Sequence, residues 1–173
     1  MKQYVIILSR TFPKWHPRAG EPTYFKEQVE IALGKYAAVQ ILDENGRYIE
    51  AILNPKYHTL RGNYERREKI FEQIDRGEAC LVLKQWSGVP YRSKQETIAV
   101  LTKEDGIGLQ KLTLDPSLEC CGTVPSNTWI PRGVPEPTLA KYDGLSYEDW
   151  KSWFWNCDFS KPFALIQFTK KRY

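Results

Sequence analysis

A lysine, a threonine and an arginine at close spacing could bind an anion or activate a nucleophile. They are Lys56, Thr59 and Arg61, in the run PKYHTLR that begins at Pro55. In a strand, residues two apart share a face, so Thr59 and Arg61 would point the same way, and a turn after Pro55 could bring the Lys56 ammonium to that side. A hydroxyl beside an ammonium and a guanidinium suits nucleophilic catalysis or anion binding. The alternative is that these basic residues lie solvated at a strand edge.

A second candidate is the polar loop 86–95, in which aromatic rings alternate with cations and small hydroxyls. Its sequence, WSGVPYRSKQ, contains Trp86, Tyr91, Arg92 and Lys94. Rings stack on unpaired bases while arginine and lysine contact phosphates, which is how single-stranded nucleic acid is commonly bound. The alternative is an exposed hairpin whose rings cover one end of a barrel.

Several familiar chemistries have no support in the sequence. The chain has no Gly-x-Gly-x-x-Gly, Walker or Gly-x-Ser-x-Gly motif. Its histidines, His16 and His58, have no metal-ligand spacing to the four cysteines, and no Cys-x-x-Cys pair occurs. Strand alternation also turns His58 away from Thr59. We therefore predict no metal and no cofactor, and we do not expect hydrolysis by a histidine base.

Length and composition indicate one folded domain spanning residues 1–173. The chain is 42% hydrophobic and 27% charged, with 25 basic and 21 acidic residues for a net charge of +4. This mild charge is lower than that of most dedicated duplex-binding proteins, although a local basic groove remains compatible with it. No apolar run approaches the roughly 20 residues of a membrane span, and no cleavage site follows the first residues. We therefore expect a cytoplasmic protein with no membrane partner.

The elements that must position these residues form an α+β pattern. Three helices are expected: one opened by Pro22-Thr23 and ended near Gly34, one over 64–76 capped by Asn63, and one beginning at Ser146. A hairpin over 36–53 turns at Asn45-Gly46. The stretch 115–141 holds five prolines and is expected to be mostly irregular. The other strand-like runs are 4–9, 79–85, 96–101 and 163–169, and we expect these four to pair in one closed or nearly closed, mainly antiparallel sheet.

The motif Lys56-Tyr57-His58-Thr59-Leu60-Arg61 resembles the signature Lys-x-x-Thr-x-Arg of the ASCH family, relatives of the PUA-like RNA-binding β-barrels. Asp143-Gly144-Leu145-Ser146 before a helix and the run Phe163–Phe168 also resemble the end of that family. More narrowly, Gly20–Phe25, Val89–Gln95 and Gly106–Leu112 resemble uncharacterised ASCH-like proteins of bacteriophages and bacterial mobile elements. The resemblance covers roughly two-thirds of the chain, mostly through the order of its elements.

This resemblance implies a PUA-like β-barrel with flanking helices, and it implies a possible active site. Family members similar to N4-acetylcytidine amidohydrolases use the signature lysine and threonine, together with a glutamate before the last helix. By position these become Lys56, Thr59 and Asp143, which we expect to converge on one pocket. Two departures are evident: Asp143 is one methylene shorter than glutamate, and the hairpin over 36–53 is an insertion.

The sequence therefore predicts that the protein binds RNA or a modified nucleoside. We expect a basic groove that contains Lys56, Thr59, Arg61, Arg92 and Lys94, with the rings of the 86–95 loop stacking on bases. The alternative is an amidohydrolase acting on an acylated nucleoside, or a ribonuclease. An accessory interaction module without a ligand is a further possibility, and the oligomeric state stays open.

Overall fold

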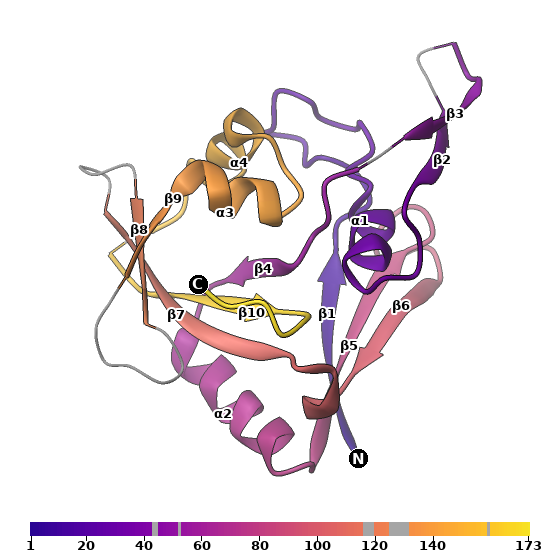
Figure 1. Ribbon diagram of the computed structural model, residues 1–173. Coiled ribbons are helices and arrows are strands. Elements are labelled where there is room, and N and C mark those ends of the chain that lie inside the picture. The colour runs from indigo at the N-terminus through magenta and orange to yellow at the C-terminus, as the bar shows by residue number, and fades with distance from the viewer. Residues whose placement is uncertain (43–44, 52, 116–119, 125–131, 159) are drawn as a thin grey trace.

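The computed structural model describes residues 1–42, 45–51, 53–115, 120–124, 132–158 and 160–173. These residues form an α+β fold in which strands build two main sheets and a separate hairpin (Figure 1). The helices are α1 (Phe25–Ala32), α2 (Tyr64–Asp75), α3 (Glu136–Tyr142) and α4 (Tyr147–Phe154). A short 3-10 helix covers Lys103–Asp105.

The first sheet has three strands in the order β1-β5-β6: β1 (Lys2–Leu8), β5 (Ala79–Trp86) and β6 (Gln95–Leu101). β1 runs parallel to β5, with Lys2 opposite Ala79 and Leu8 opposite Gln85. β6 pairs antiparallel with β5, and the register shifts between Leu83 and Lys84. The β5–β6 turn carries the predicted 86–95 loop.

The second sheet has five strands, all antiparallel, in the order β4-β10-β7-β8-β9. In this sheet Thr59 of β4 lies opposite Ile166 of β10. The helix α2 packs against β7 and β10, and α3 contacts β9 and α4, so helices lie on both sides of the sheet (Figure 1). The strands are β4 (His58–Arg61), β7 (Gly108–Asp115), β8 (Cys120–Val124), β9 (Arg132–Pro135) and β10 (Phe163–Gln167).

One hydrophobic core joins the sheets and helices. Leu83 of β5, Ile74 of α2 and Leu165 of β10 have no exposed surface and belong to the same buried cluster. Trp150 and Phe154 of α4 bury their rings in that cluster. This shared core fixes the positions of the strand ends, from which the candidate functional residues emerge.

The predicted starts of two helices and the predicted hairpin are confirmed, whereas α1 begins only at Phe25, after Tyr24, and no side chain caps it. The Asn63 side chain accepts a hydrogen bond from the Arg66 amide and begins α2, and the Ser146 side chain accepts one from the Asp149 amide and begins α4. The expected hairpin is present as β2 (Val39–Leu42) and β3 (Tyr48–Ala51), which pair antiparallel. Figure 1 shows it projecting from the body of the protein.

Two expectations about the fold need correction. The four runs expected in one sheet are divided between two, because β10 pairs with β4 and β7 while β1 pairs with β5. Within the described residues no closed barrel forms, and the first pairing of the chain is parallel. The stretch 115–141 is less irregular than expected: β8, β9 and α3 occupy much of its described part. Pro137 fits the first turn of α3, where no amide donor is needed.

No helix within the described parts of the chain is both long and apolar enough to cross a membrane.

Candidate functional site

A buried ion pair joins Lys56 to Asp143. The Lys56 ammonium donates hydrogen bonds to both the side-chain Oδ1 and the backbone oxygen of Asp143, across 87 residues of sequence. Only 1% of the Lys56 side chain and 4% of the Asp143 side chain are exposed. Lys56 also lies over the ring of Phe25, with Nζ 4.0 Å from the centroid. A lysine that is almost fully buried is unusual, because burying its charge is costly. The pairing with Asp143 compensates part of that cost.

Burial changes the acid–base properties of this pair. It lowers the pKa of the Lys56 ammonium and raises the pKa of the Asp143 carboxyl, while the attraction between the two groups acts in the opposite direction on each. Because burial disfavours both charged forms, the neutral amine and neutral acid lie closer in free energy to the ion pair than they do in water. Proton exchange between Lys56 and Asp143 therefore costs less than it would between exposed groups.

Short segments of backbone hold the pair in place. The Lys56 amide donates to the Gln28 carbonyl of α1 at 3.0 Å, and the next amide, of Tyr57, donates to the Tyr142 carbonyl at 2.8 Å. Asp143 ends α3 and precedes Gly144, whose φ of 79° lies in the left-handed region that glycine favours. Gly144 therefore allows the chain to turn at the end of α3, where the Asp143 side chain is buried.

Gln28 is a part of this site that the sequence did not indicate. Gln28 is 6% exposed, and its side-chain Nε2 donates to the Gly144 carbonyl at 3.0 Å. A Cβ atom on Gly144 would lie 2.1 Å from Gln28 Oε1, so only glycine leaves room for this amide. The only signal in the sequence is a glutamine on the face of α1 that also carries apolar residues.

Thr59 and Arg61 form a second polar group on β4. The Arg61 guanidinium donates to Thr59 Oγ1 and to the Leu60 carbonyl, both at 2.9 Å, and to the Ile7 carbonyl of β1 at 3.0 Å. Thr59 is 3% exposed. Arg61 therefore bridges the two sheets, and it presents positive charge to a hydroxyl that is otherwise a poor nucleophile.

His58, on the same strand, belongs to another buried network. Its Nδ1 lies 2.9 Å from the Tyr173 hydroxyl, and burial lowers the pKa of His58 well below its ordinary value. The Gln110 side chain holds Tyr173 through both the amide and the carbonyl of that residue, at 3.1 and 3.0 Å. Tyr173 and Gln110 were not predicted as site residues, because no local pattern connects them to β4.

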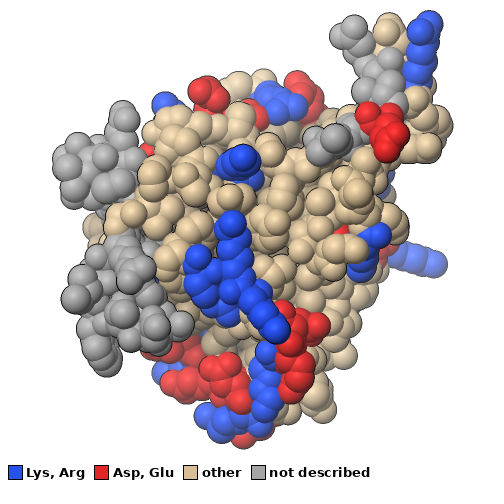
Figure 2. Space-filling model, in the orientation of Figure 1, with Lys and Arg blue, Asp and Glu red and all other residues tan. Residues whose placement is uncertain are grey.

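The basic segment 170–172 lies along the body of the protein. Lys171 Nζ is 3.7 Å from the centroid of the Tyr142 ring, and Arg172 donates to the Gly106 carbonyl at 2.8 Å. Figure 2 shows a band of basic side chains across the middle of this face, over the region of β10 and the C-terminal end in Figure 1. Part of the positive charge of the protein is therefore concentrated on one face.

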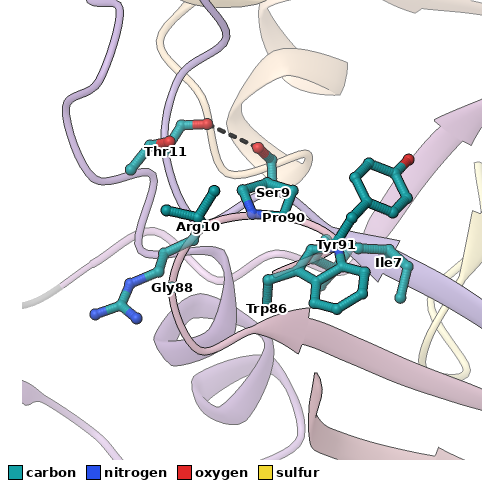
Figure 3. Close-up of a pocket in the computed structure, with 10 residues that line it drawn as sticks. Ile7, Ser9, Arg10, Thr11, Trp86, Gly88, Pro90 and Tyr91 are labelled. Carbon is teal, nitrogen blue, oxygen red and sulfur yellow. Dashed lines mark hydrogen bonds between the residues drawn. The ribbon is translucent and has the colours of Figure 1, made fainter. Parts of the chain in front are cut away.

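The 86–95 loop borders a pocket of about 560 Å³. The ring centroids of Trp86 and Tyr91 are 5.4 Å apart, and Tyr91 is 89% exposed with a φ of 64°. Figure 3 shows the two rings next to each other with Ile7 of β1 beside them, and Ser9, Arg10 and Thr11 on the other side of the view. The pocket is lined by Ile7, Leu8, Ser9, Arg10, Thr11, Trp86, Gly88, Val89, Pro90 and Tyr91.

Hydrogen bonds within the turn hold this loop in shape. Ser93 Oγ accepts from the Gly88 amide and donates to the Val89 carbonyl, at 3.0 and 2.9 Å. Ser87 pairs with Lys94 through a backbone bond of 2.9 Å. The side chains of Arg92 and Lys94 are exposed on this turn. The aromatic rings and the cations therefore occupy a defined turn beside the pocket.

The structure divides the predicted site in two. Lys56 and Asp143 meet directly, and Thr59 meets Arg61, but Lys56 is too deeply buried to share a surface groove with Arg92 and Lys94. Trp86 and Tyr91 do border a pocket. The segment 9–11 completes this pocket. Ser9 was predicted only as the end of the strand-like run 4–9, and Arg10 and Thr11 were not predicted as site residues.

No group of three or more potential metal-ligating side chains occurs among the residues that the structure describes. No family model, curated protein or solved structure matches the chain. The resemblance to the ASCH family, which comes from sequence motifs, stays a prediction.

Proposed function

We propose that the protein binds single-stranded RNA or a modified nucleoside, with a base held in the pocket beside Trp86 and Tyr91. The observation that carries this proposal is the pocket itself, with two aromatic rings on one side and two exposed cations on the same turn. The resemblance to ASCH domains and PUA-like barrels supports the same class of ligand.

The proposed binding mode sets the expected strength and its dependence on salt. Stacking of one base on an aromatic side chain contributes about 1–3 kcal/mol. Arg92 and Lys94 can each contact one phosphate, and single strands release roughly 0.7 counterions per contact. The salt dependence should therefore be shallow, and an accessible, unpaired base should be required.

Fluorescence titration with a mixed single-stranded RNA pool and with a duplex of the same composition tests this proposal. We expect the single strands to bind more tightly at low salt, and Trp86→Ala to weaken binding by about 5- to 150-fold, the equivalent of one stacked base. Trp155→Ala is the matched control, because Trp155 is 66% exposed and does not line the pocket. Absence of RNA binding at low salt, or equal losses in both variants, would refute the proposal.

A specific observation supports amidohydrolase activity as the second candidate. The buried pair Lys56–Asp143 includes an amine whose pKa is lowered, and Arg61 donates to the hydroxyl of Thr59. This mechanism requires the Lys56 ammonium and the Thr59 hydroxyl, which share no hydrogen bond among the described residues, to approach each other when substrate binds. Neutral Lys56 would then accept the Thr59 proton as the Thr59 oxygen attacks an acyl carbon, and neutral Asp143 would give its proton to the leaving amine. Water would then hydrolyse the acyl-enzyme.

Turnover of N4-acetylcytidine and other acylated nucleosides tests this second candidate. Loss of turnover in both Lys56→Ala and Thr59→Ala, with circular dichroism unchanged, would support the enzyme. Absence of turnover by the wild type, with ligand still bound at the pocket, would favour a binding module. Electrophoresis of the RNA recovered from the titration would reveal a ribonuclease by its shortened products.

A further inference from the structure

The pocket beside the 86–95 loop has two chemically different ends. Trp86 and Tyr91 form an aromatic end, while Arg10 lies on the opposite side (Figure 3). The Arg10 side chain is exposed and extends away from the two rings, with its guanidinium at the far end. The walls between are mainly apolar, with the polar Ser9 and Thr11 close to Arg10.

Arg10 combines a fixed backbone with a free guanidinium. Its carbonyl accepts from the Thr23 amide at 3.0 Å and from Thr23 Oγ1 at 3.3 Å, and the adjacent Thr11 forms a β-bridge with Pro22. Its guanidinium makes no hydrogen bond or ion pair with any residue that the structure describes. By contrast, the nearby Arg18 is paired with both Glu21 and Asp149. Arg10 is therefore positioned to bind an anion from outside the protein.

The size of the pocket indicates how much of a ligand it holds. At about 560 Å³ it lies within the range of small-molecule sites and exceeds what a single base needs. The hydroxyl of Ser9 donates to the Thr11 carbonyl at 2.7 Å, so its oxygen remains able to accept a hydrogen bond from a sugar hydroxyl. The aromatic wall suits a base, the Ser9 hydroxyl suits a sugar hydroxyl, and the Arg10 guanidinium suits an anionic group.

We propose that this pocket binds one nucleoside monophosphate unit in a fixed orientation, with its base against Trp86 and Tyr91 and its phosphate on Arg10. The inference rests on the proposed function and deepens it by assigning the phosphate of the bound nucleotide to one residue. Arg92 and Lys94 lie on the turn that carries the rings, so they contact phosphates of neighbouring nucleotides in a longer strand.

Calorimetric titration with adenosine, cytidine and their 5′- and 3′-monophosphates tests the orientation. We expect one monophosphate series to bind roughly tenfold or more tightly than the nucleosides, as a charge-assisted contact provides. Arg10→Ala should remove this ratio, and Arg10→Lys should restore part of it. Lys161→Ala is the matched control, since Lys161 is an exposed cation outside the pocket lining, and it should preserve the ratio.

The titrations with RNA and with monophosphates distinguish failure of the proposed RNA binding from failure of the proposed nucleotide orientation. RNA binding that depends on Trp86, with the same phosphate ratio in wild type and Arg10→Ala, would overturn the orientation alone. Loss of the ratio in Lys161→Ala instead of Arg10→Ala would also overturn it. Failure of the RNA pool to bind would overturn the function itself.

Discussion

Replacement of Asp143 by asparagine tests the buried ion pair most directly. Asparagine keeps the shape of the side chain and an oxygen that can accept from Lys56, but it removes the negative charge. Since Lys56 is 1% exposed, its ammonium would stay buried without a counter-charge. Removing one partner of a buried pair typically costs about 3–5 kcal/mol, and the retained acceptor places Asp143→Asn near the lower end, about 3 kcal/mol. This is a large part of the ~5–15 kcal/mol that stabilises an ordinary domain.

The deficit should also depend on pH. Burial lowers the pKa of Lys56, and loss of Asp143 removes the attraction that opposes this effect. A lysine with a lower pKa when folded binds fewer protons in the folded than in the unfolded state, so stability rises with pH up to the ordinary lysine value of about 10.4. The unfolding free energy of Asp143→Asn should therefore approach that of the wild type as the pH is raised from 7 to 9.

Urea unfolding of four proteins measures the effect: wild type, Asp143→Asn, Lys56→Met and the double variant. We expect the double variant to be more stable than Asp143→Asn, because it contains no unpaired buried charge. Glu78→Gln is the control, since Glu78 pairs with Arg76 in an exposed position and its loss should leave the midpoint unchanged. A cost below about 1 kcal/mol for Asp143→Asn, with no dependence on pH, would refute the reasoning.

Two further predictions concern residues beside this pair. Burial lowers the pKa of His58, so below pH 6.5 the unfolded state binds more protons than the folded state. The free energy of unfolding should therefore fall between pH 6.5 and 5, by up to about 1.4 kcal/mol per pH unit. In urea unfolding, His58→Gln should show a weaker dependence of this free energy on pH. If His58→Gln showed the same pH dependence as the wild type, His58 would not be the group that controls stability in this pH range. Gly144→Ala should cost about 1–3 kcal/mol from the positive φ and should displace Gln28, whereas Gly34→Ala has a similar φ but open space and should cost less. Equal losses in thermal unfolding would contradict the contact with Gln28.

The elements that the sequence predicted correctly are those with local signals. Asn63 and Ser146 each satisfy backbone donors within one turn, so the beginnings of α2 and α4 follow from residues three positions apart. The β2–β3 hairpin was likewise predicted from Asn45-Gly46, a local signal that lies in the connection between Leu42 and Tyr48. None of these features depends on where distant segments lie.

Pairing between distant strands could not be predicted in this way. Apolar runs of strand length such as 4–9 and 163–169 show where strands form, but they contain no information about partner or direction. The parallel contact of β1 with β5 joins residues 77 positions apart, as in Lys2 opposite Ala79. The resulting division into two sheets follows from packing of the whole chain around one core.

The candidate site shows the same distinction. The pairing of Lys56 with Asp143 had support only from the family resemblance, because no local pattern connects residues 87 positions apart. The rings of Trp86 and Tyr91 were found from composition and spacing within one loop. Arg10, which completes the pocket, was overlooked because its importance depends on the approach of β1 to the β5–β6 turn.

Arg61 contacts both the buried Thr59 and Ile7, which lines the pocket. These contacts explain why Arg61 does not form one basic groove with Arg92 and Lys94, as the sequence predicted. Its guanidinium donates to Thr59 Oγ1, Leu60 O and Ile7 O, so three of its five donors are already bound within the protein. An arginine held in this way positions the edges of two sheets and has less capacity to bind a phosphate. Ile7 itself lines the pocket, so Arg61 fixes one wall of the pocket while it also fixes the hydroxyl of Thr59. Under the proposed function, we therefore assign the phosphate contacts to Arg10, Arg92 and Lys94, and we assign to Arg61 the role of holding β1, at the pocket wall, against β4.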